Sequence, residues 1–470
     1  MDHILFPYIL FYSRLQFKGT IMIQNTRIEI LNSAPEKKGR FVVYWMQQSQ
    51  RSVYNHALEY AIESANERNL PMVVFFALTE FPEANLRHYW FMLQGLKLTK
   101  EDLHNRGIQL VISHTVPDKG IIDFSRNASL VVTDMGYLHI QRLWRKNAAV
   151  ELDCPLIQIE SDVIVPIREA SDKEEFSAGT LRPKLTKKLK EYLVPLHERE
   201  LKKNSINLKF KSIDLTNIRN AISLLHIDIT VQPVEWLHGG TSDAESLLRD
   251  FIRNKLDYFA THRNDPSKEY SSNLSPYFHF GQISPLYVAL EINKAKSSGK
   301  DAFLEEMIVR RELSMNFVWY NPHYDSIKAL PNWARLTLDQ HKNDKRYTVY
   351  SSDQLEYGKT QDSYWNAAQK EMLVRGKMHG YMRMYWGKKI LEWTDNPEDA
   401  YRIALYLNNK YELDGRDANG FTGIAWCFGK HDRAWKERPT YGKVRYMNAE
   451  GLKRKFKIEE YVKKVNSLGN

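Results

Sequence analysis

Short runs of apolar residues alternate with amphipathic stretches over the first third of the chain. The runs cover residues 41–45 (FVVYW), 72–78 (MVVFFAL), 108–113 (IQLVIS), 129–134 (SLVVTD) and 155–160 (PLIQIE). Runs of this length, rich in Val, Ile and Phe, are typical of parallel strands that are buried on both faces of a sheet. The pattern predicts a doubly wound parallel-sheet α/β domain over residues 40–165. Ligands of such domains bind beyond the carboxyl ends of the strands.

The periodicity becomes helical after residue 244, in long segments such as residues 245–263 and 301–320. Apolar residues there recur every three to four positions, which favours amphipathic helices over strands. We therefore predict an all-α domain over residues 244–470. Residues 166–243 are predicted to form an interdomain connector, and residues 1–39 an N-terminal extension.

Composition and charge restrict the class of protein. The apolar start of the chain is interrupted by Pro7 and is shorter than the roughly 20 residues that a membrane span needs. Two cysteines, Cys154 and Cys427, cannot build a disulfide framework, so we expect a reducing, cytoplasmic setting. The net charge of +10, with 15 Lys and Arg against 8 Asp and Glu in residues 401–470, favours a polyanionic partner.

Two familiar nucleotide motifs are missing from the predicted sheet. No GxGxxG sequence and no P-loop follows any of the five apolar runs. The α/β domain is therefore either a structural unit with a degenerate pocket or a site for a different kind of ligand.

The segment SSNLSPYFHFGQIS (residues 271–284) carries small hydroxyl side chains just before a helix start with proline. Such a start leaves backbone N–H groups free for phosphate oxygens. Ser-Pro turns are common, so on these residues alone a plain helix cap is the favoured interpretation.

Charged residues follow in EEMIVRREL (residues 305–313), where Glu306, Arg310 and Glu312 have the spacing of ordinary surface ion pairs.

The most unusual segments are KMHGYMRMYWGKKILEW (residues 377–393) and NNKYELDGRDANGFTGIAW (residues 408–426). They combine aromatic residues, Met and Arg with an acidic turn and a Gly-rich stretch, and contain no nucleophile or metal-ligand spacing. This composition suits a site for a large flat redox cofactor. Trp386 and Trp393 share one helix face about 10.5 Å apart, at roughly 1.5 Å rise per residue, a spacing that core packing would also explain.

Cations and aromatic residues alternate in HDRAWKERPTYGKVRYM (residues 431–447). This mixture suits phosphates and unpaired bases, although a solvated helix face would also be cationic.

From about Arg40 to the C-terminus, these segments resemble the class II cyclobutane pyrimidine dimer photolyases, members of the photolyase and cryptochrome superfamily. The resemblance implies an α/β antenna domain followed by a helical catalytic domain that binds FAD, active as FADH−. It also implies an antenna chromophore of the deazaflavin type. The partner would be double-stranded DNA that contains pyrimidine dimers, and the protein would be a monomer.

The resemblance assigns FAD contacts residue by residue. Arg383 and Asp414 would flank the isoalloxazine ring, Asn408 would face its N5 atom, and Ser272, Leu274 and Ser275 would hold the pyrophosphate. The family usually has Tyr where this chain has Phe259, and the neighbouring Tyr258 is a differently directed substitute. The full set of expected FAD contacts is Phe259, Ser272, Leu274, Ser275, Arg311, Asn316, Arg383, Asn408, Asp414 and Asp417, and Gly423 would complete the adenine and ribose side.

Glu306 would donate a hydrogen bond to a pyrimidine carbonyl, either protonated or through an intervening group, and Met384 would touch the substrate. The (6-4) photolyases instead rely on histidines beside their substrate. This chain has Met384 and no matching histidine there, which favours cyclobutane dimers as the lesion. Trp426 would stack on the lesion, but the loop between GIAW and HD is one residue shorter than is usual in the family. The expected substrate and DNA contacts are Arg263, Arg310, Trp426, Arg433, Trp435, Arg438 and Arg445.

Trp386, Trp365 and Trp393 match the electron-transfer chain of class II photolyases, in that order from flavin to surface, with Tyr350 as an auxiliary branch. The sequence thus predicts light-driven repair of cyclobutane pyrimidine dimers. Two alternatives remain: a cryptochrome-like light sensor without repair activity, and a nucleic-acid-binding structural protein that has lost flavin.

Overall fold

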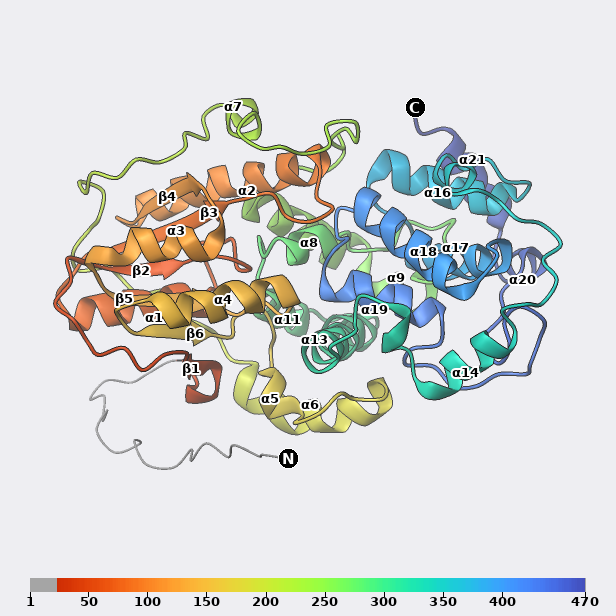
Figure 1. The fold of residues 1–470 in the computed structure, drawn as a ribbon, viewed down its shortest axis with the longest axis horizontal. Helices are drawn as coiled ribbons and strands as arrows, with labels where there is room; N and C mark the ends of the chain where they lie inside the picture. Colours follow the sequence, from red (N-terminus) through yellow and green to blue (C-terminus); the bar gives the residue numbers. More distant parts are fainter. Residues whose placement is uncertain (1–22, 470) are drawn as a thin grey trace.

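The computed structural model describes residues 23–469, and one six-stranded sheet organises its first third (Figure 1). The strand order is β1-β6-β5-β2-β3-β4, and all neighbours are parallel except the β1–β6 pair. The strands are β1 (Ile28–Ile30), β2 (Phe41–Trp45), β3 (Met72–Leu78), β4 (Gln109–His114), β5 (Ala128–Asp134) and β6 (Leu156–Ile159).

Helices cover both faces of this sheet because successive side chains of a strand point to opposite faces. Val42 and Tyr44 of β2 pack in the core cluster that contains helices α1 and α2. Val43 and Trp45 pack in a second cluster with residues of α3 and α4. The predicted α/β sheet is therefore confirmed.

β1 lies within the segment that the sequence analysis assigned to the N-terminal extension. Ile28 and Ile30 pair with Ile159 and Ile157 of β6, so the sheet gains an antiparallel edge strand. Residues 1–22 of that predicted extension lie outside the described residues.

Helices dominate the chain after the sheet. Helices α1 to α11 are α1 (His56–Glu67), α2 (Leu86–Asn105), α3 (Pro117–Phe124), α4 (His139–Glu151), α5 (Ile167–Ala170), α6 (Ala178–Tyr192), α7 (Ile218–Ile222), α8 (Thr241–Asn254), α9 (Leu256–His262), α10 (Ser275–His279) and α11 (Pro285–Lys294). The later ones are α12 (Lys300–Leu304), α13 (Arg311–Tyr320), α14 (Asn332–Gln340), α15 (Ser352–Glu356), α16 (Ser363–Arg375), α17 (Gly380–Trp393), α18 (Pro397–Tyr411), α19 (Ala418–Cys427), α20 (Ala449–Lys455) and α21 (Ile458–Asn466).

Four short helical turns complete the assignment. Three are 3₁₀ turns, η1 (Asn25–Arg27), η2 (Ser125–Asn127) and η4 (Ile327–Ala329). The fourth, η3 (Glu305–Arg310), is a π-helical segment between α12 and α13. Wide turns of this kind are frequent at functional sites, and this one carries Glu306 and Arg310.

A further core cluster lies in the helical half, where α16, α17, α18 and α19 bury Trp365, Trp386 and Ile424 completely, whereas α8, α9 and α11 share the core cluster of the sheet. The predicted succession of an α/β domain and a helical domain is thus confirmed, and the helical half forms the right-hand part of Figure 1. Within residues 23–469, none of the helices combines the length and the apolar character that crossing a bilayer requires.

Candidate functional site

A group of buried charges lies where α17 passes the turn that follows α18. The Arg383 Nη2 atom is 3.1 Å from Glu412 Oε1 and 3.5 Å from Asp414 Oδ1. Burial raises the pKa of Glu412 to about 8. Burial also acts to raise the pKa of Asp414, but Arg383 and Lys377 outweigh it and hold that pKa at about 2. Arg383 and Asp414 therefore form a buried pair of opposite charges.

Asn408 of α18 lies beside these charges with an unused acceptor. Its Nδ2 atom donates to Asn409 Oδ1 at 3.2 Å, but its Oδ1 atom is buried and has no partner among the described residues. The Arg383 Nε and Glu412 Oε2 atoms are likewise buried and have no partner among the described residues. Buried polar atoms are nearly always paired, so this concentration of unpaired atoms fits a polar cofactor such as a flavin.

Gly420 of α19 lets the backbone come close to the same place. A Cβ atom at this position would lie 3.2 Å from Asn408 Nδ2 and 3.5 Å from the Asp414 carbonyl oxygen. Asn408 and Asp414 therefore flank the start of α19, where Asp417 caps the helix by accepting from the Gly420 N–H at 2.6 Å.

The SSNLSP segment leads into α10 and contacts the charge cluster directly. Lys377 Nζ donates to Ser275 Oγ at 2.6 Å. Ser272 Oγ accepts from the Leu274 N–H at 3.4 Å, and Leu274 is fully buried. At the other end of α10, His279 Nδ1 lies 3.7 Å from Asp417 Oδ2. The structure thus brings Ser275, Arg383, Asn408, Asp414 and Asp417 together.

Two further predicted cofactor residues instead bind the α/β half and the connector. Arg311 donates to the Asp162 carbonyl oxygen at 2.6 Å and to Asp162 Oδ2 at 2.7 Å. Asn316 Oδ1 accepts from the Glu175 N–H at 2.7 Å, and its Nδ2 donates to the Lys173 carbonyl oxygen at 2.9 Å. The polar atoms of Asn316 are therefore committed to the connector between the domains.

Phe259 packs in an aromatic core, with ring centroids 5.6 Å from Phe251 and 5.3 Å from Phe303. Tyr258 is 51% exposed and its ring lies 5.1 Å from that of Tyr270. The Tyr258 side chain is therefore directed to the surface.

Glu306 and Arg263 form an ion pair, with both side chains partly exposed. This contact places the guanidinium of Arg263 directly against the Glu306 side chain.

Trp426, near the end of α19, is flanked by two side chains from other segments. The Arg310 guanidinium carbon lies 5.5 Å from the Trp426 ring centroid, and the His431 ring lies 5.8 Å from it at a steep angle. His431 adopts a left-handed backbone conformation with φ of 57°. Burial lowers its pKa to about 4, so the imidazole beside Trp426 is neutral.

Three tryptophans form a continuous contact chain from the core to the surface. The Trp386 and Trp365 ring centroids are 6.3 Å apart, and those of Trp365 and Trp393 are 5.6 Å apart. Trp386 and Trp365 have no exposed surface, whereas Trp393 is 7% exposed. Tyr350 extends this chain of aromatic rings, with its ring centroid 5.2 Å from that of Trp393. Trp386 shares helix α17 with Arg383, so the chain begins beside the charge cluster.

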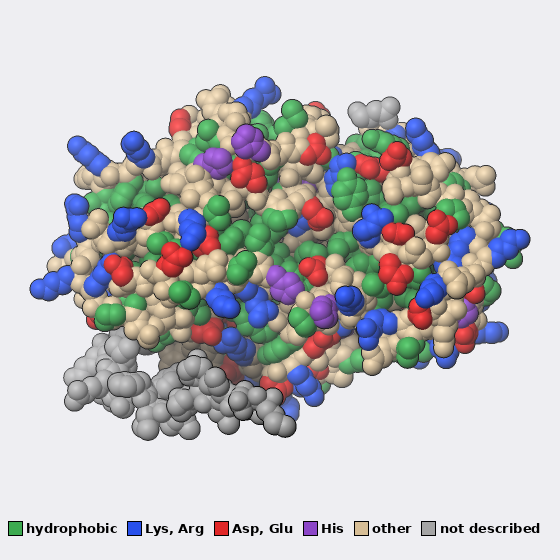
Figure 2. Space-filling model, viewed as in Figure 1, with side chains coloured by type: hydrophobic (Ala, Val, Ile, Leu, Met, Phe, Trp, Pro, Cys, Tyr) green, Lys and Arg blue, Asp and Glu red, His purple; other side chains and the backbone are tan. Residues whose placement is uncertain are grey.

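The segment after α19 presents stacked cations and aromatic rings. The guanidinium carbons of Arg433 and Arg445 lie 5.1 and 4.4 Å from the Trp435 ring centroid. Arg438 lies 4.9 Å from the ring centroid of Tyr446. The face of the molecule shown in Figure 2 differs from this segment, because Lys and Arg (blue) and Asp and Glu (red) are interspersed over its helical half.

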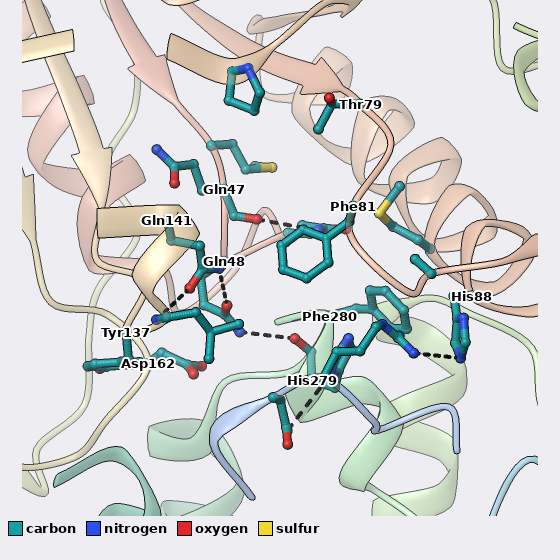
Figure 3. A pocket seen from close by; sticks show the side chains of 18 of the residues that line it. Gln47, Gln48, Thr79, Phe81, His88, Tyr137, Gln141, Asp162, His279 and Phe280 are labelled. Atoms are coloured by element: carbon teal, nitrogen blue, oxygen red, sulfur yellow. Dashed lines mark hydrogen bonds and ion pairs between the residues drawn. The ribbon is translucent and has the colours of Figure 1, made fainter. Parts of the chain in front are cut away.

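A cavity of about 140 Å³ lies at the carboxyl ends of the strands, between the sheet and the helical half (Figure 3). Asp134, at the end of β5, shapes one wall by accepting from the N–H groups of Gln47, Gln48 and Ser49 at 2.6 to 2.9 Å. Gln48 then bridges the two halves, donating to the His279 carbonyl oxygen at 2.9 Å while accepting from Gln141 at 3.1 Å.

Five buried polar atoms of the residues that line the cavity have no hydrogen-bond partner among the described residues: Trp45 Nε1, Gln47 Oε1, Gln50 Oε1, Asp162 Oδ1 and His279 Nδ1. One indole donor, three oxygen acceptors and one imidazole nitrogen around mostly apolar walls suit an aromatic ligand with polar edges. The sequence analysis named none of these residues. The run Gln47–Gln50 directly after β2 was the available signal, because ligands bind beyond the carboxyl ends of such strands.

Comparisons with known proteins agree with this architecture. Residues 42–202 match the DNA photolyase domain. The chain is 54% identical to a deoxyribodipyrimidine photo-lyase of Methanothermobacter thermautotrophicus over 95% of this chain and 99% of that protein. It is also 41% identical to a protein of the same name from Arabidopsis thaliana, over 96% and 94% of the two chains, and 40% identical to one from Potorous tridactylus, over 90% and 81%.

Solved structures share the fold at low identity. A class III photolyase from Agrobacterium tumefaciens superposes with a TM-score of 0.69 at 17% identity, covering 92% of this chain and 87% of that one. A cryptochrome from Synechocystis sp. PCC6803 gives 0.69 at 14% identity, covering 91% and 89%. The chain belongs to the deoxyribodipyrimidine photolyase family, as the sequence predicted.

Proposed function

We propose that this protein repairs cyclobutane pyrimidine dimers in double-stranded DNA with light, as a monomer in the compartment that holds the DNA. The observation that carries the proposal is the chain of Trp386, Trp365 and Trp393, which leads from the buried polar cluster around Arg383 towards the surface. Photoreduction of an oxidised flavin needs such a route, and repair by electron transfer from the reduced flavin needs no nucleophile or metal.

The buried cluster suits FAD, and its residues have distinct tasks. When bound in its reduced form, FAD supplies the electron that opens the cyclobutane ring after light absorption. Arg383 and Asp414 hold opposite charges against the flat ring, which biases its stable redox state. The unpaired Oδ1 atom of Asn408 accepts from a ring N–H group. Ser272, Leu274, Ser275 and Asp417 would hold the phosphate and adenine parts of FAD.

The lesion would bind outside this cluster, between η3 and α19. A fused dimer stacks poorly, so its extrusion from the duplex costs less than the few kcal/mol typical of an ordinary base. Trp426 offers a ring to the extruded dimer. Met384 is held at the site by Cys427, whose Sγ atom lies 3.9 Å from the Met384 Sδ atom. Arg263 binds a carbonyl or phosphate oxygen, and Glu306 orients it.

The contact with DNA would come from the segment that carries Arg433, Trp435, Arg438 and Arg445. The guanidinium groups that lie against Trp435 and Tyr446 are pre-oriented by these rings, which lowers the entropy cost of binding phosphates.

We assign the cavity at the carboxyl ends of the strands to an antenna chromophore of the deazaflavin type. Because its volume is about 140 Å³, the side chains of its lining would have to move apart to admit a three-ring molecule. The unpaired atoms of Trp45, Gln47, Gln50 and Asp162 would recognise the polar edge of its ring. Gln48 and His279 connect this cavity with α10, so a chromophore there would lie close to the cofactor site.

The test uses two oligonucleotides, one with a single cyclobutane thymine dimer and one with a (6-4) product. After illumination with the reduced protein, chromatography should show restored thymines only for the cyclobutane dimer. Repair of the (6-4) product would refute the assignment of the lesion. Binding of flavin without repair of either lesion would favour the light-sensor alternative.

A further inference from the structure

A second cavity, of about 210 Å³, lies at the outer end of the tryptophan chain, and Trp393 forms part of its wall. The other lining residues that matter here are Lys345, Arg346, Tyr347, Arg438 and Tyr446. Trp393 is otherwise almost buried, so this cavity is where its remaining exposed surface meets solvent. Its lining includes none of the buried charged residues around Arg383 and none of the residues that line the cavity in Figure 3.

The charge of this cavity is positive. Lys345, Arg346 and Arg438 line it, and Glu392 is its one acidic residue. Glu392 is already neutralised, because Lys389 Nζ contacts its Oε2 atom at 2.8 Å and the Tyr441 hydroxyl donates to the same atom at 2.7 Å. An anion is therefore the favoured occupant.

Arg346 gives this cavity a fixed positive charge. Its Nε atom donates to the Thr394 carbonyl oxygen at 3.2 Å, and its Nη1 atom donates to the Lys342 and Asp344 carbonyl oxygens at 2.9 and 2.6 Å. A guanidinium held in this way keeps its charge at a constant place in the cavity wall.

Size and shape narrow the chemistry of the ligand. The cavity is smaller than the roughly 300 Å³ at which drug-sized pockets begin, so it accepts a molecule of about one ring. Tyr347, Tyr446 and Trp393 supply aromatic walls, which favour a planar molecule.

We propose that this cavity binds a small, planar, anionic one-electron donor that reduces Trp393 during photoreduction of the protein. The inference rests on the proposed function, in which an electron leaves Trp386 and is replaced through Trp365, so that Trp393 is left as a radical cation. An enediolate such as ascorbate gives one electron to Trp393 and one proton to water. Trp393 returns to the neutral indole, and the donor becomes its radical anion.

The experiment follows the decay of the tryptophan radical after a light flash, in the oxidised holoprotein, at increasing ascorbate concentration. A binding cavity predicts that the decay rate saturates. Replacing Lys345 by Glu changes the local charge by two units, which should slow the decay about fivefold at low ionic strength if the donor lies about 8 Å away. This difference should disappear in concentrated salt. Neutral hydroquinone should be insensitive to the substitution.

The chain offers a matched control. Lys345 lies 5.8 Å from the ring centroid of Tyr347, and Lys359 lies 5.7 Å from that of Tyr357, but Lys359 is not part of the cavity lining. Lys359→Glu should therefore leave the reaction with ascorbate unchanged. An equal effect of both substitutions, or a rate that rises linearly with ascorbate up to its solubility, would overturn the proposal. If no tryptophan radical forms in the wild-type protein, the electron-transfer chain itself is wrong, which is a different result.

Discussion

The indole rings of Trp365 and Trp386 are parallel to within 8°, with their centroids 6.3 Å apart. Trp365 Nε1 donates to the Trp386 carbonyl oxygen at 3.0 Å, and Trp386 Nε1 donates to Gln369 Oε1 at 2.7 Å. Both rings are thus fixed by hydrogen bonds as well as by packing. A fixed, stacked pair keeps the distance for electron transfer constant, which a merely packed core pair would not require.

Trp386→Phe should abolish photoreduction of the oxidised protein, because it removes the first member of the tryptophan chain. Repair by protein that was reduced chemically beforehand should be unaffected. Trp319→Phe is the control, since Trp319 contacts Arg142 and Arg168 and lies outside the chain. Flavin absorbance under blue light measures the first effect. Loss of repair in the reduced Trp386→Phe protein would show that Trp386 has another role.

Asn408→Leu should make the reduced protein oxidise in air about tenfold faster, the effect of losing one hydrogen bond of roughly 1.4 kcal/mol. The amide Oδ1 atom is the unpaired acceptor beside Arg383 and Asp414, and Leu keeps its approximate size. Absorbance in the dark after mixing with oxygen measures the rate. An unchanged rate would remove Asn408 from the cofactor contacts.

Glu306→Ala should lower the yield of repair several-fold while leaving the affinity for dimer-containing DNA unchanged or increased. The substitution removes the partner of Arg263, which then becomes free to bind a phosphate. Glu305→Ala is the control, because Glu305 contacts Arg182 and Arg310 instead. Repair per absorbed photon and DNA affinity are measured separately. A loss of affinity with normal repair would contradict the role proposed for Glu306.

The buried carboxyl group of Glu312 should make stability depend on pH. Burial raises its pKa from 4.5 to about 8, and its oxygens accept from the Ile164 N–H at 2.6 Å and the Val165 N–H at 3.4 Å. Its stabilising contribution is therefore complete below about pH 4.5 and is lost as the pH rises towards 8.

Glu312→Gln keeps an acceptor and removes the titration. Its melting temperature should therefore fall less between pH 5 and pH 8 than that of the wild type. The corresponding difference in the unfolding free energy is on the order of a few kcal/mol. Glu160, whose pKa burial raises to about 7, leaves a residual slope in both proteins. Identical pH profiles would show that Glu312 is ionised in the folded protein.

The sequence predicted the sheet well where burial alone decides structure. The bounds predicted for residues 41–45 and 72–78 are those of β2 and β3, because all their side chains are buried and the apolar run is unbroken. β1 was missed, since its sequence Ile-Glu-Ile is short and becomes a strand only by pairing with β6.

The site was predictable only in part, because tertiary contacts decide it. Spacing placed Trp386 and Trp393 on one helix, but Trp365 belongs to α16 and no periodicity relates the two helices. In the same way, no local pattern reveals that Arg311 binds Asp162, which lies in the α/β half. Arg383, Asn408 and Asp414 came from the resemblance, and the structure brings them together as that resemblance implied.

The most direct test of the central claim uses purified, chemically reduced protein and an oligonucleotide with one cyclobutane thymine dimer. Opening of the dimer restores the thymine double bonds, so ultraviolet absorbance of the DNA reports repair. We predict that absorbance recovers under blue light and stays constant in a dark control. Absence of recovery, with flavin present and DNA bound, would contradict the assignment of this protein as a repair enzyme.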